Sequence, residues 1–271
     1  MSPNENPSVK IIIATHKLYE FPIDEIYLPL QVGKIDKKSL GLTGDDEGDN
    51  ISRKNAMYCE LTGLYWAWKN LKYDYIGLVH YRRHFSVKSH FFWETGKFTN
   101  VLNYKELSSI ILNADIIVPT KRNYYIETLY SHYAHTHHKE HLDSARTIIG
   151  KKYPSYLNSF DKIMNYRAGY MFNMMIMRRE LLDKYCSWLF SILFELENEV
   201  IHEELNSFHL RYPGRVSEIL FNVWIDHEKM INPTIKIQSL NHIHMEKINW
   251  IHKGKSFLMA KVRKNKYNGS F

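Results

Sequence analysis

Short apolar runs alternate along the chain with longer stretches in which apolar residues recur every three or four positions. The short runs have the length and residue content of buried strands, and they lie at 9–14, 75–83, 115–119, 170–177 and 234–238. The helical stretches lie at 55–71, 105–112, 132–150, 179–200 and 216–225. Strands that alternate with helices predict an α/β fold in which helices flank a mostly parallel central sheet. We expect one domain over residues 1–240 and a basic C-terminal appendix over 241–271.

Composition narrows the class of protein only slightly. Aromatic residues make up 14% of the 271 residues, which permits a site that stacks on sugars or bases. The first ten residues lack the apolar segment of a secretory signal, and the most apolar stretch, 185–196, is too short to span a bilayer. The two cysteines, Cys59 and Cys186, are too few for a disulfide framework or a cysteine metal cage. We therefore expect a cytoplasmic protein.

Positive charge is concentrated near the end of the chain. The net charge is +7, and residues 253–266 contain six Lys or Arg residues and no acid. This tail is either a solubilising end or an attachment to an anionic membrane surface, with residues 257–259 as an apolar anchor. The second interpretation predicts peripheral contact with the inner face of the plasma membrane.

Polar and basic residues follow three of the predicted strands. In an open α/β sheet, ligands bind beyond the carboxyl ends of the strands. The residues at these three ends are Thr15-His16-Lys17, His80-Tyr81-Arg82-Arg83 and Thr120-Lys121-Arg122. Lys and Arg at such positions suit a nucleotide diphosphate, because their charge compensates the phosphate oxygens.

Several segments together resemble one known family. These segments are 44–70, 75–85 with its His-Tyr-Arg-Arg motif, 153–157, 171–197 and 214–225. They resemble the bacterial capsule and lipopolysaccharide glycosyltransferases that carry the HYRR motif, a family long catalogued as a domain of unknown function. The resemblance covers about residues 10–230.

The resemblance implies a GT-A-like, Rossmann-like nucleotide-sugar fold and a hexosyltransferase. The donor would be a UDP-sugar carrying galactofuranose, galactose or glucose, and the acceptor a growing glycan, expected to be lipid-linked. The implied donor-binding residues are Thr15, His16, Lys17, Asp49, Asn50, Asn55, His80, Tyr81, Arg82 and Arg83. Better-known GT-A enzymes carry a metal-binding Asp-x-Asp where this chain has His80-Tyr81-Arg82. We therefore expect guanidinium groups in place of a divalent metal, and no cofactor. The alternative is Mn²⁺ or Mg²⁺ bound by His80 or by the carboxylates of an acidic loop at 41–50, which are Asp45, Asp46, Glu47 and Asp49.

Three residues in the second half of the chain are candidates for the sugar side of the site. Glu218 is suited to accept the proton of the acceptor hydroxyl, although an acid in the first turn of a helix is equally expected from the helix dipole. Arg215 and Asn173 are candidates for contact with the acceptor or the sugar, and Asn173 is expected inside an apolar strand.

Two other interpretations compete with the glycosyltransferase. Five histidines between 132 and 141 suggest zinc, but they lack a completing ligand set and are expected to be core or surface residues. The basic balance and the aromatic content also allow a nucleic-acid-binding protein. No RNA- or DNA-binding motif occurs in the sequence, so we do not expect a nucleic-acid partner.

Overall fold

The computed structural model describes residues 7–89, 96–201 and 205–246, and the chain divides into two compact units. Unit 1 is drawn from residues 1–120, 173–186 and 234–247, and unit 2 from 121–172, 187–233 and 248–271. The sequence suggested one domain over 1–240, whereas two interleaved units divide this range. The expected boundary after residue 240 falls inside a strand, and most of the predicted appendix lies outside the described residues.

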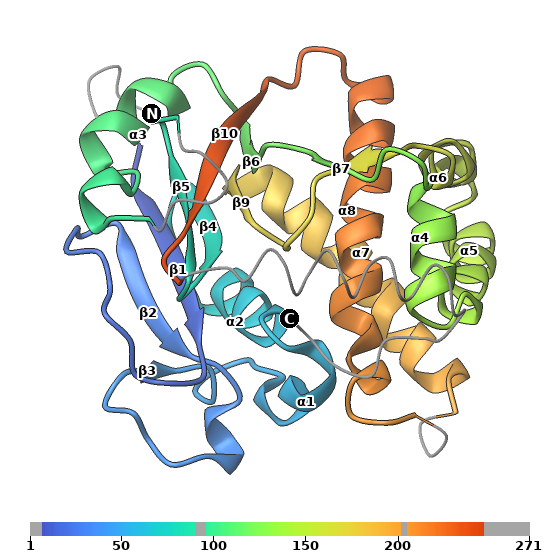
Figure 1. Cartoon of the computed structure of the whole chain (residues 1–271), viewed down its shortest axis with the longest axis horizontal. Coiled ribbons are helices and arrows are strands. Elements are labelled where there is room, and N and C mark those ends of the chain that lie inside the picture. The colour runs from blue at the N-terminus through green and yellow to red at the C-terminus, as the bar shows by residue number, and fades with distance from the viewer. Residues whose placement is uncertain (1–6, 90–95, 202–204, 247–271) are drawn as a thin grey trace. The chain divides into compact units, whose positions relative to one another are not determined.

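The main sheet belongs to unit 1 and has the order β3–β2–β1–β4–β5–β10–β6–β9 (Figure 1). Its strands are β1 (Val9–Thr15), β2 (Tyr27–Gln31), β3 (Thr43–Gly44), β4 (Tyr75–His80), β5 (Arg83–Ser86), β6 (Ile116–Pro119), β9 (Met175–Arg178) and β10 (Ile237–His244). β1 runs parallel to β2 and β4, and β10 runs parallel to β6. β5 and β9 are antiparallel to their neighbours. The sheet is therefore mixed, and the expected mostly parallel sheet holds only for the β3–β2–β1–β4 half and the β10–β6 pair.

Five strands of the sheet close into a ring. Along one edge β4 pairs with β1, and along its other edge residues 75–78 pair with β9 while His80 pairs with Arg83 of β5. Because β5 pairs with β10, β10 with β6, and β6 with β9, the pairing returns to β4. The late strand β10, drawn in red in Figure 1, thus joins two strands formed from the first half of the chain.

The core of unit 1 forms because β1 has neighbours on both edges and is apolar on both faces. Ile11, Ile12 and Ile13 are fully buried, as expected for a central parallel strand. Helix α2 (Leu61–Asn70) packs on β1 and β4. Gly63 allows a close approach, because a Cβ there would lie 3.0 Å from Val32. Helix α3 (Tyr104–Ile111) confirms the helix predicted over 105–112, and it begins at a capping box formed by Asn103 and Glu106.

The helix predicted over 55–71 is interrupted. A 3₁₀ turn at Ser52–Lys54 leads into α1 (Asn55–Tyr58), and Cys59, with φ of 51°, separates α1 from α2. The side-chain amide of Asn55 donates to the Cys59 carbonyl oxygen at 2.7 Å. This side-chain bond competes with the helical pattern, which explains the break.

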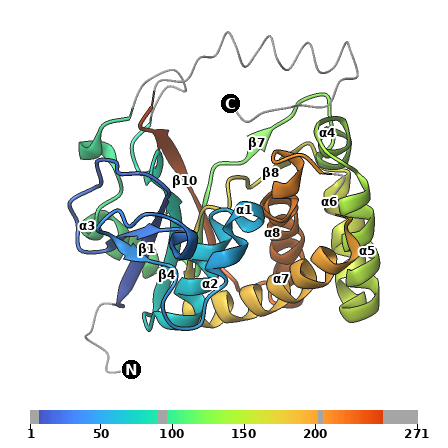
Figure 2. The same ribbon diagram turned by 90° about the horizontal axis from the view of Figure 1, so that it is seen from below.

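Unit 2 is mainly helical. Its helices α4 (Leu129–Thr136), α5 (Glu140–Lys152), α6 (Leu157–Met164) and α8 (Tyr212–Ile231) pack together, and a small ribbon joins β7 (Arg122–Asn123) to β8 (Ala168–Gly169) (Figure 2). Helix α7 (Arg179–Glu199) begins in unit 1 and ends in unit 2.

Other elements differ from the sequence prediction. The histidine-rich segment forms two helices, α4 and α5, and Gly150 lies inside α5 rather than at its end. The helix predicted over 216–225 is the centre of the longer α8, and the strand predicted over 234–238 is displaced to β10. The strand predicted over 170–177 is shorter, because Asn173 has φ of 51° and β9 starts at Met175.

Candidate functional site

Two of the predicted strand ends meet at one edge of the sheet. β1 and β4 are parallel neighbours, and Ala14 lies opposite His80. The residues that follow, including His16 and Tyr81, therefore leave the sheet side by side. The rings of His16 and Tyr81 contact each other edge to face, with centroids 5.3 Å apart. Two of the three predicted strand ends are therefore neighbours, and their role in donor binding stays a prediction.

Cations gather around Tyr81 in a group that we call the basic cluster, defined as His16, Lys17, Tyr81, Arg82 and Glu246. The Lys17 ammonium lies 4.8 Å from the centre of the Tyr81 ring and 3.2 Å from Glu246. Arg82 lies 3.4 Å from the other oxygen of Glu246. Burial acts to raise the pKa of Glu246, but its hydrogen bonds to Lys17 and Arg82 outweigh burial and lower the pKa below its ordinary value.

Sequence reasoning missed Glu246. It lies more than 160 residues after Arg82 and beside the basic tail, so only the pairing of β10 with β5 brings it to this edge. One carboxylate, Glu246, thus compensates the charge of two cations. The side chains of both cations remain partly exposed to solvent, with exposed fractions of 46% for Lys17 and 40% for Arg82. The cluster retains a positive excess that is open to an anionic ligand.

The HYRR motif forms a tight hairpin rather than one straight strand. β4 ends at His80, Tyr81 and Arg82 form the turn, and Arg83 begins β5. The side chain of Arg83 donates to Nε2 of His244 on β10 at 3.4 Å. At the turn Arg82 stays partly exposed beside the buried Tyr81, whereas Arg83 is tied to the sheet. Thr15 is also used internally, because its buried hydroxyl donates to the Lys17 carbonyl oxygen at 2.6 Å.

The acidic loop at 41–50 is organised by a buried carboxylate. Asp45 is fully buried and accepts hydrogen bonds from the amides of Gly33 and Lys34 and from the hydroxyls of Ser52 and Thr62. With these donors satisfying its oxygens, Asp45 holds the loop in place.

The other loop residues predicted to bind the donor contact the neighbouring segments of unit 1. Asp49 accepts from the Tyr65 hydroxyl at 3.1 Å and lies 3.9 Å from Lys69, both on α2. The Asn50 amide donates to backbone carbonyls of its own loop, and Asn55 bonds to Cys59 and Thr62. No contact joins these three residues to the basic cluster within the part of the chain described, and their role toward the donor stays a prediction.

Asn173 lies before β9 rather than inside a strand. Its side chain donates to Glu60 at 2.7 Å, next to the left-handed Cys59. A left-handed backbone at a non-glycine residue is rare, and here it occurs at both Cys59 and Asn173. The polar bond between these two turns explains why Asn173 tolerates burial.

Arg215 and Glu218 line one pocket of unit 2, of about 130 Å³. We call it the α4–α8 pocket, because these two helices supply most of its walls. The lining residues are Arg122, Tyr124, Leu129, His132, Tyr133, Thr136, His137, Met171, Arg215, Glu218 and Ile219. The two sequence candidates are thus brought together, and histidines that the sequence assigned to core or surface share their pocket.

Neighbouring side chains fix the direction of Arg215. Its NH1 group lies 3.1 Å from Nε2 of His137, and its guanidinium lies over the Phe208 ring at 4.1 Å. Burial, reinforced by the charge of Arg215, lowers the pKa of His137 to about 2, so this ring is neutral at physiological pH. Because arginine only donates, Nε2 of His137 must accept, and the guanidinium is held without losing its charge.

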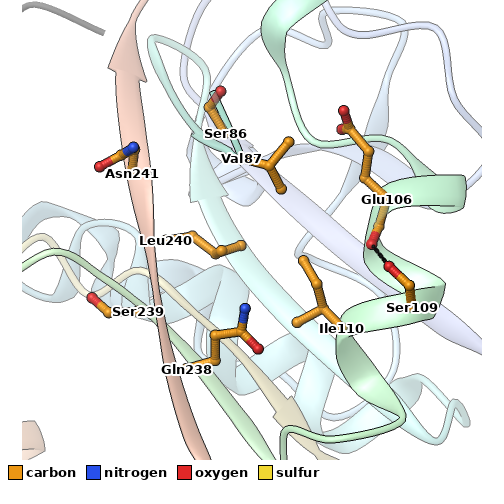
Figure 3. A pocket seen from close by; sticks show the side chains of 9 residues that line it. All are labelled: Ser86, Val87, Glu106, Ser109, Ile110, Gln238, Ser239, Leu240 and Asn241. Atoms are coloured by element: carbon orange, nitrogen blue, oxygen red, sulfur yellow. Dashed lines mark hydrogen bonds between the residues drawn. The ribbon is translucent and has the colours of Figure 1, made fainter. Parts of the chain in front are cut away.

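A larger, polar pocket of about 450 Å³ lies in unit 1, between β10 and α3 (Figure 3). Gln238 and Leu240 point toward Ile110 of α3, whereas Ser239 and Asn241 lie on the other side of β10. None of the residues predicted to bind the donor or acceptor lines this pocket.

The donor set at the basic cluster does not suit a divalent metal. Its carboxylate, Glu246, is already held by Lys17 and Arg82, and these cations would repel a metal ion. Among residues 7–89, 96–201 and 205–246, no group of three His, Cys, Asp or Glu side chains is arranged to hold a metal. In the same residues, no helix is both long and apolar enough to cross a membrane.

The fold and the cluster thus define a mixed α/β protein with a cationic, aromatic site at the carboxyl ends of two parallel strands. Residues 10–229 match the family described as a domain of unknown function, DUF4422, and the chain belongs to this family. A search of the curated proteins gives no match.

One solved structure is similar over most of the chain. It is described as the apo structure of WbbM, a bifunctional glycosyltransferase, and it is 32% identical in sequence with a TM-score of 0.81. The similarity covers 88% of this chain but 45% of WbbM, so this chain spans about half the length of that protein.

Proposed function

We propose that this protein is a glycosyltransferase that moves a hexose from a UDP-sugar to a glycan acceptor. The similarity to a bifunctional glycosyltransferase supports the reaction class. The sugar is galactofuranose, galactose or glucose in this proposal, and the acceptor is a lipid-linked capsular or lipopolysaccharide glycan. The GT-A type of fold is part of the same proposal.

The observation that carries the proposal is the basic cluster at the ends of β1 and β4. In glycosyl transfer the bond between the sugar and the diphosphate breaks, and negative charge develops on the leaving diphosphate. Lys17 and Arg82 are partly exposed cations that can stabilise this charge, and the exposed ring of His16 offers a face for the nucleotide. Donor binding here needs no metal, because the cations supply the compensating charge.

The acceptor side of the proposal rests on unit 2. Glu218 accepts the proton of the attacking hydroxyl, and Arg215 contacts the acceptor in the same α4–α8 pocket. Asn173 contacts the sugar, and Asp49, Asn50 and Asn55 contribute to donor binding. The basic tail at 253–266, outside the described residues, attaches the protein to anionic lipid.

Calorimetric titration with UDP, ADP and GDP tests the donor part. We expect UDP to bind more tightly than the other two, and the Lys17→Ala variant to weaken all three because it removes a phosphate-compensating charge. Equal affinity for the three nucleotides would reject the uridine assignment. Binding that does not depend on Lys17 would reject the basic cluster as the diphosphate site.

A further inference from the structure

One carboxylate in unit 2 accepts hydrogen bonds from two histidines. Oε2 of Glu127 lies 2.7 Å from Nδ1 of His132, and Oε1 lies 2.7 Å from Nδ1 of His135. Thr128 caps helix α4 immediately after Glu127, so His132 and His135 fall three residues apart on one helix face. Glu127 is buried, with 9% of its side chain exposed.

The shared carboxylate fixes the tautomer of His132. Burial acts to raise the pKa of Glu127, but the hydrogen bonds from the two imidazoles outweigh it and lower the pKa, so Glu127 is ionised and can only accept. Burial lowers the pKa of His132 more than Glu127 raises it, so the ring is neutral near pH 7. A neutral ring that donates through Nδ1 must carry a lone pair on Nε2.

His132, which carries this lone pair, is part of the wall of the α4–α8 pocket. His132 lines the pocket, whereas Glu127 does not, and the two ring nitrogens point in different directions. Nε2 of His132 has no hydrogen-bond partner among the described residues. The ring packs against Tyr124, also a lining residue, with centroids 4.2 Å apart, which limits its rotation.

The pocket therefore combines a hydrogen-bond acceptor of fixed direction, Nε2 of His132, with side chains that can only donate hydrogen bonds. Arg122 and Arg215 have N–H groups and no acceptor, so they pair with the oxygen lone pairs of a ligand. Nε2 of His132 requires the opposite, a ligand group that carries a hydrogen. A sugar hydroxyl satisfies both, because it donates one hydrogen bond and accepts others.

We propose that His132 is a specificity-determining residue that accepts a hydrogen bond from a hydroxyl of the acceptor sugar, and that Glu127 is its positioning residue. The hydroxyl is a different one from the hydroxyl that reacts at Glu218, so the pocket selects an acceptor with at least two free hydroxyls. This inference rests on the proposed function, because it takes the α4–α8 pocket as the acceptor site.

The test pairs variants of the protein with variants of the sugar. Methyl galactopyranoside, methyl glucopyranoside and their singly deoxygenated derivatives serve as probes, titrated by saturation-transfer NMR and then used as acceptors for UDP-galactose. In the wild type, removal of the recognised hydroxyl should weaken binding roughly 2- to 12-fold, the loss of one neutral hydrogen bond. In His132→Ala the same derivative should bind as well as its parent sugar, with the change appearing in KM rather than kcat.

His135→Ala is the matched control, since His135 bonds to the same carboxylate but does not line the pocket. It should discriminate among the sugars as the wild type does. Glu127→Gln should weaken discrimination, because an amide no longer dictates which nitrogen of His132 carries hydrogen. Long-range ¹H–¹⁵N spectra of the wild type should show His132 protonated at Nδ1, a readout that does not depend on any variant folding.

Three results would overturn the inference. They are wild-type discrimination retained in His132→Ala, a His132 ring protonated at Nε2, and no binding of any probe sugar by a wild-type protein that still binds UDP. The last result would leave the donor part of the proposed function standing. Failure to bind UDP as well would remove the proposed function itself.

Discussion

Replacement of Arg82 by alanine should reduce transfer far more than it reduces stability. Arg82 is 40% exposed and its contact with Glu246 is long, at 3.4 Å. An exposed ion pair of this kind contributes about 0–1 kcal/mol, and Lys17 remains beside Glu246 in the variant. The melting temperature should therefore fall by no more than about 4 °C.

The effect on transfer is larger because the proposed partner of Arg82 is a charged phosphate oxygen. A hydrogen bond to a charged group is worth about 1.5–3 kcal/mol, so kcat/KM should fall roughly 10- to 150-fold. Release of UDP from each UDP-hexose gives the rate, and differential scanning calorimetry gives the melting temperature.

The matched control is Arg146→Ala. Arg146 is similarly exposed, at 51%, and makes two hydrogen bonds to Asp161 in unit 2, at 2.7 and 2.8 Å. Its loss should lower the melting temperature slightly and leave transfer unchanged. If Arg82→Ala transfers within twofold of the wild type, or if its activity falls only in step with its stability, the assignment of Arg82 to the diphosphate is refuted.

Four further outcomes are expected. Glu218→Gln should abolish transfer but keep UDP binding, and transfer near the wild-type rate would exclude Glu218 as the proton acceptor. Transfer should survive exhaustive EDTA treatment, whereas loss that Mn²⁺ or Mg²⁺ restores would contradict compensation by arginine. Burial lowers the pKa of His84 to about 4 in the folded protein, whereas the same imidazole in the unfolded chain has a pKa of about 6.5. As the pH drops below about 6.5, the unfolded state therefore becomes protonated at His84 before the folded state does, and the free energy of unfolding falls. Urea unfolding should show a loss of about 2 kcal/mol from this group between pH 7 and pH 5, and an unchanged pH dependence in His84→Phe would disprove it. Deletion of 253–271 should weaken sedimentation with anionic liposomes but not with neutral ones, and equal sedimentation of both proteins would leave the tail a solubilising end.

The elements best predicted from the sequence are those in which the spacing of apolar residues along the chain matches the residues that are buried in the structure. β1, β6, α3 and α7 lie close to the predicted ranges, because each is a continuous apolar run or a strong helical period. β2 was missed, since Pro29 stands in its middle and proline usually argues against a strand. The ring of strands that β10 closes could not be predicted either, because the sequence around β5 does not indicate which distant strand will pair with it.

The basic cluster was easier to predict than the α4–α8 pocket. Residues that end two neighbouring parallel strands must share one edge, so His16 and Tyr81 could be placed together from the strand pattern alone. The hydrogen bond between Glu127 and His132 joins a residue that precedes helix α4 to a residue inside it, so neither the spacing of a strand nor that of a helix predicts the contact. The sequence nevertheless contained an indication of this contact. Thr128 is a typical N-cap residue, and His132 and His135, which both bond to Glu127, lie three residues apart on the helix that Thr128 caps.

The ring of strands also has a consequence for how the chain is made. β5 and β6 leave the ribosome long before β10, which is synthesised only after all of α8. Until then, one edge of each has no partner, and unpaired edges are prone to join other chains. An expression fragment cut at residue 229, where the family match ends, would carry these open edges permanently. We expect such a fragment to aggregate, whereas one that extends past His244 can close the ring.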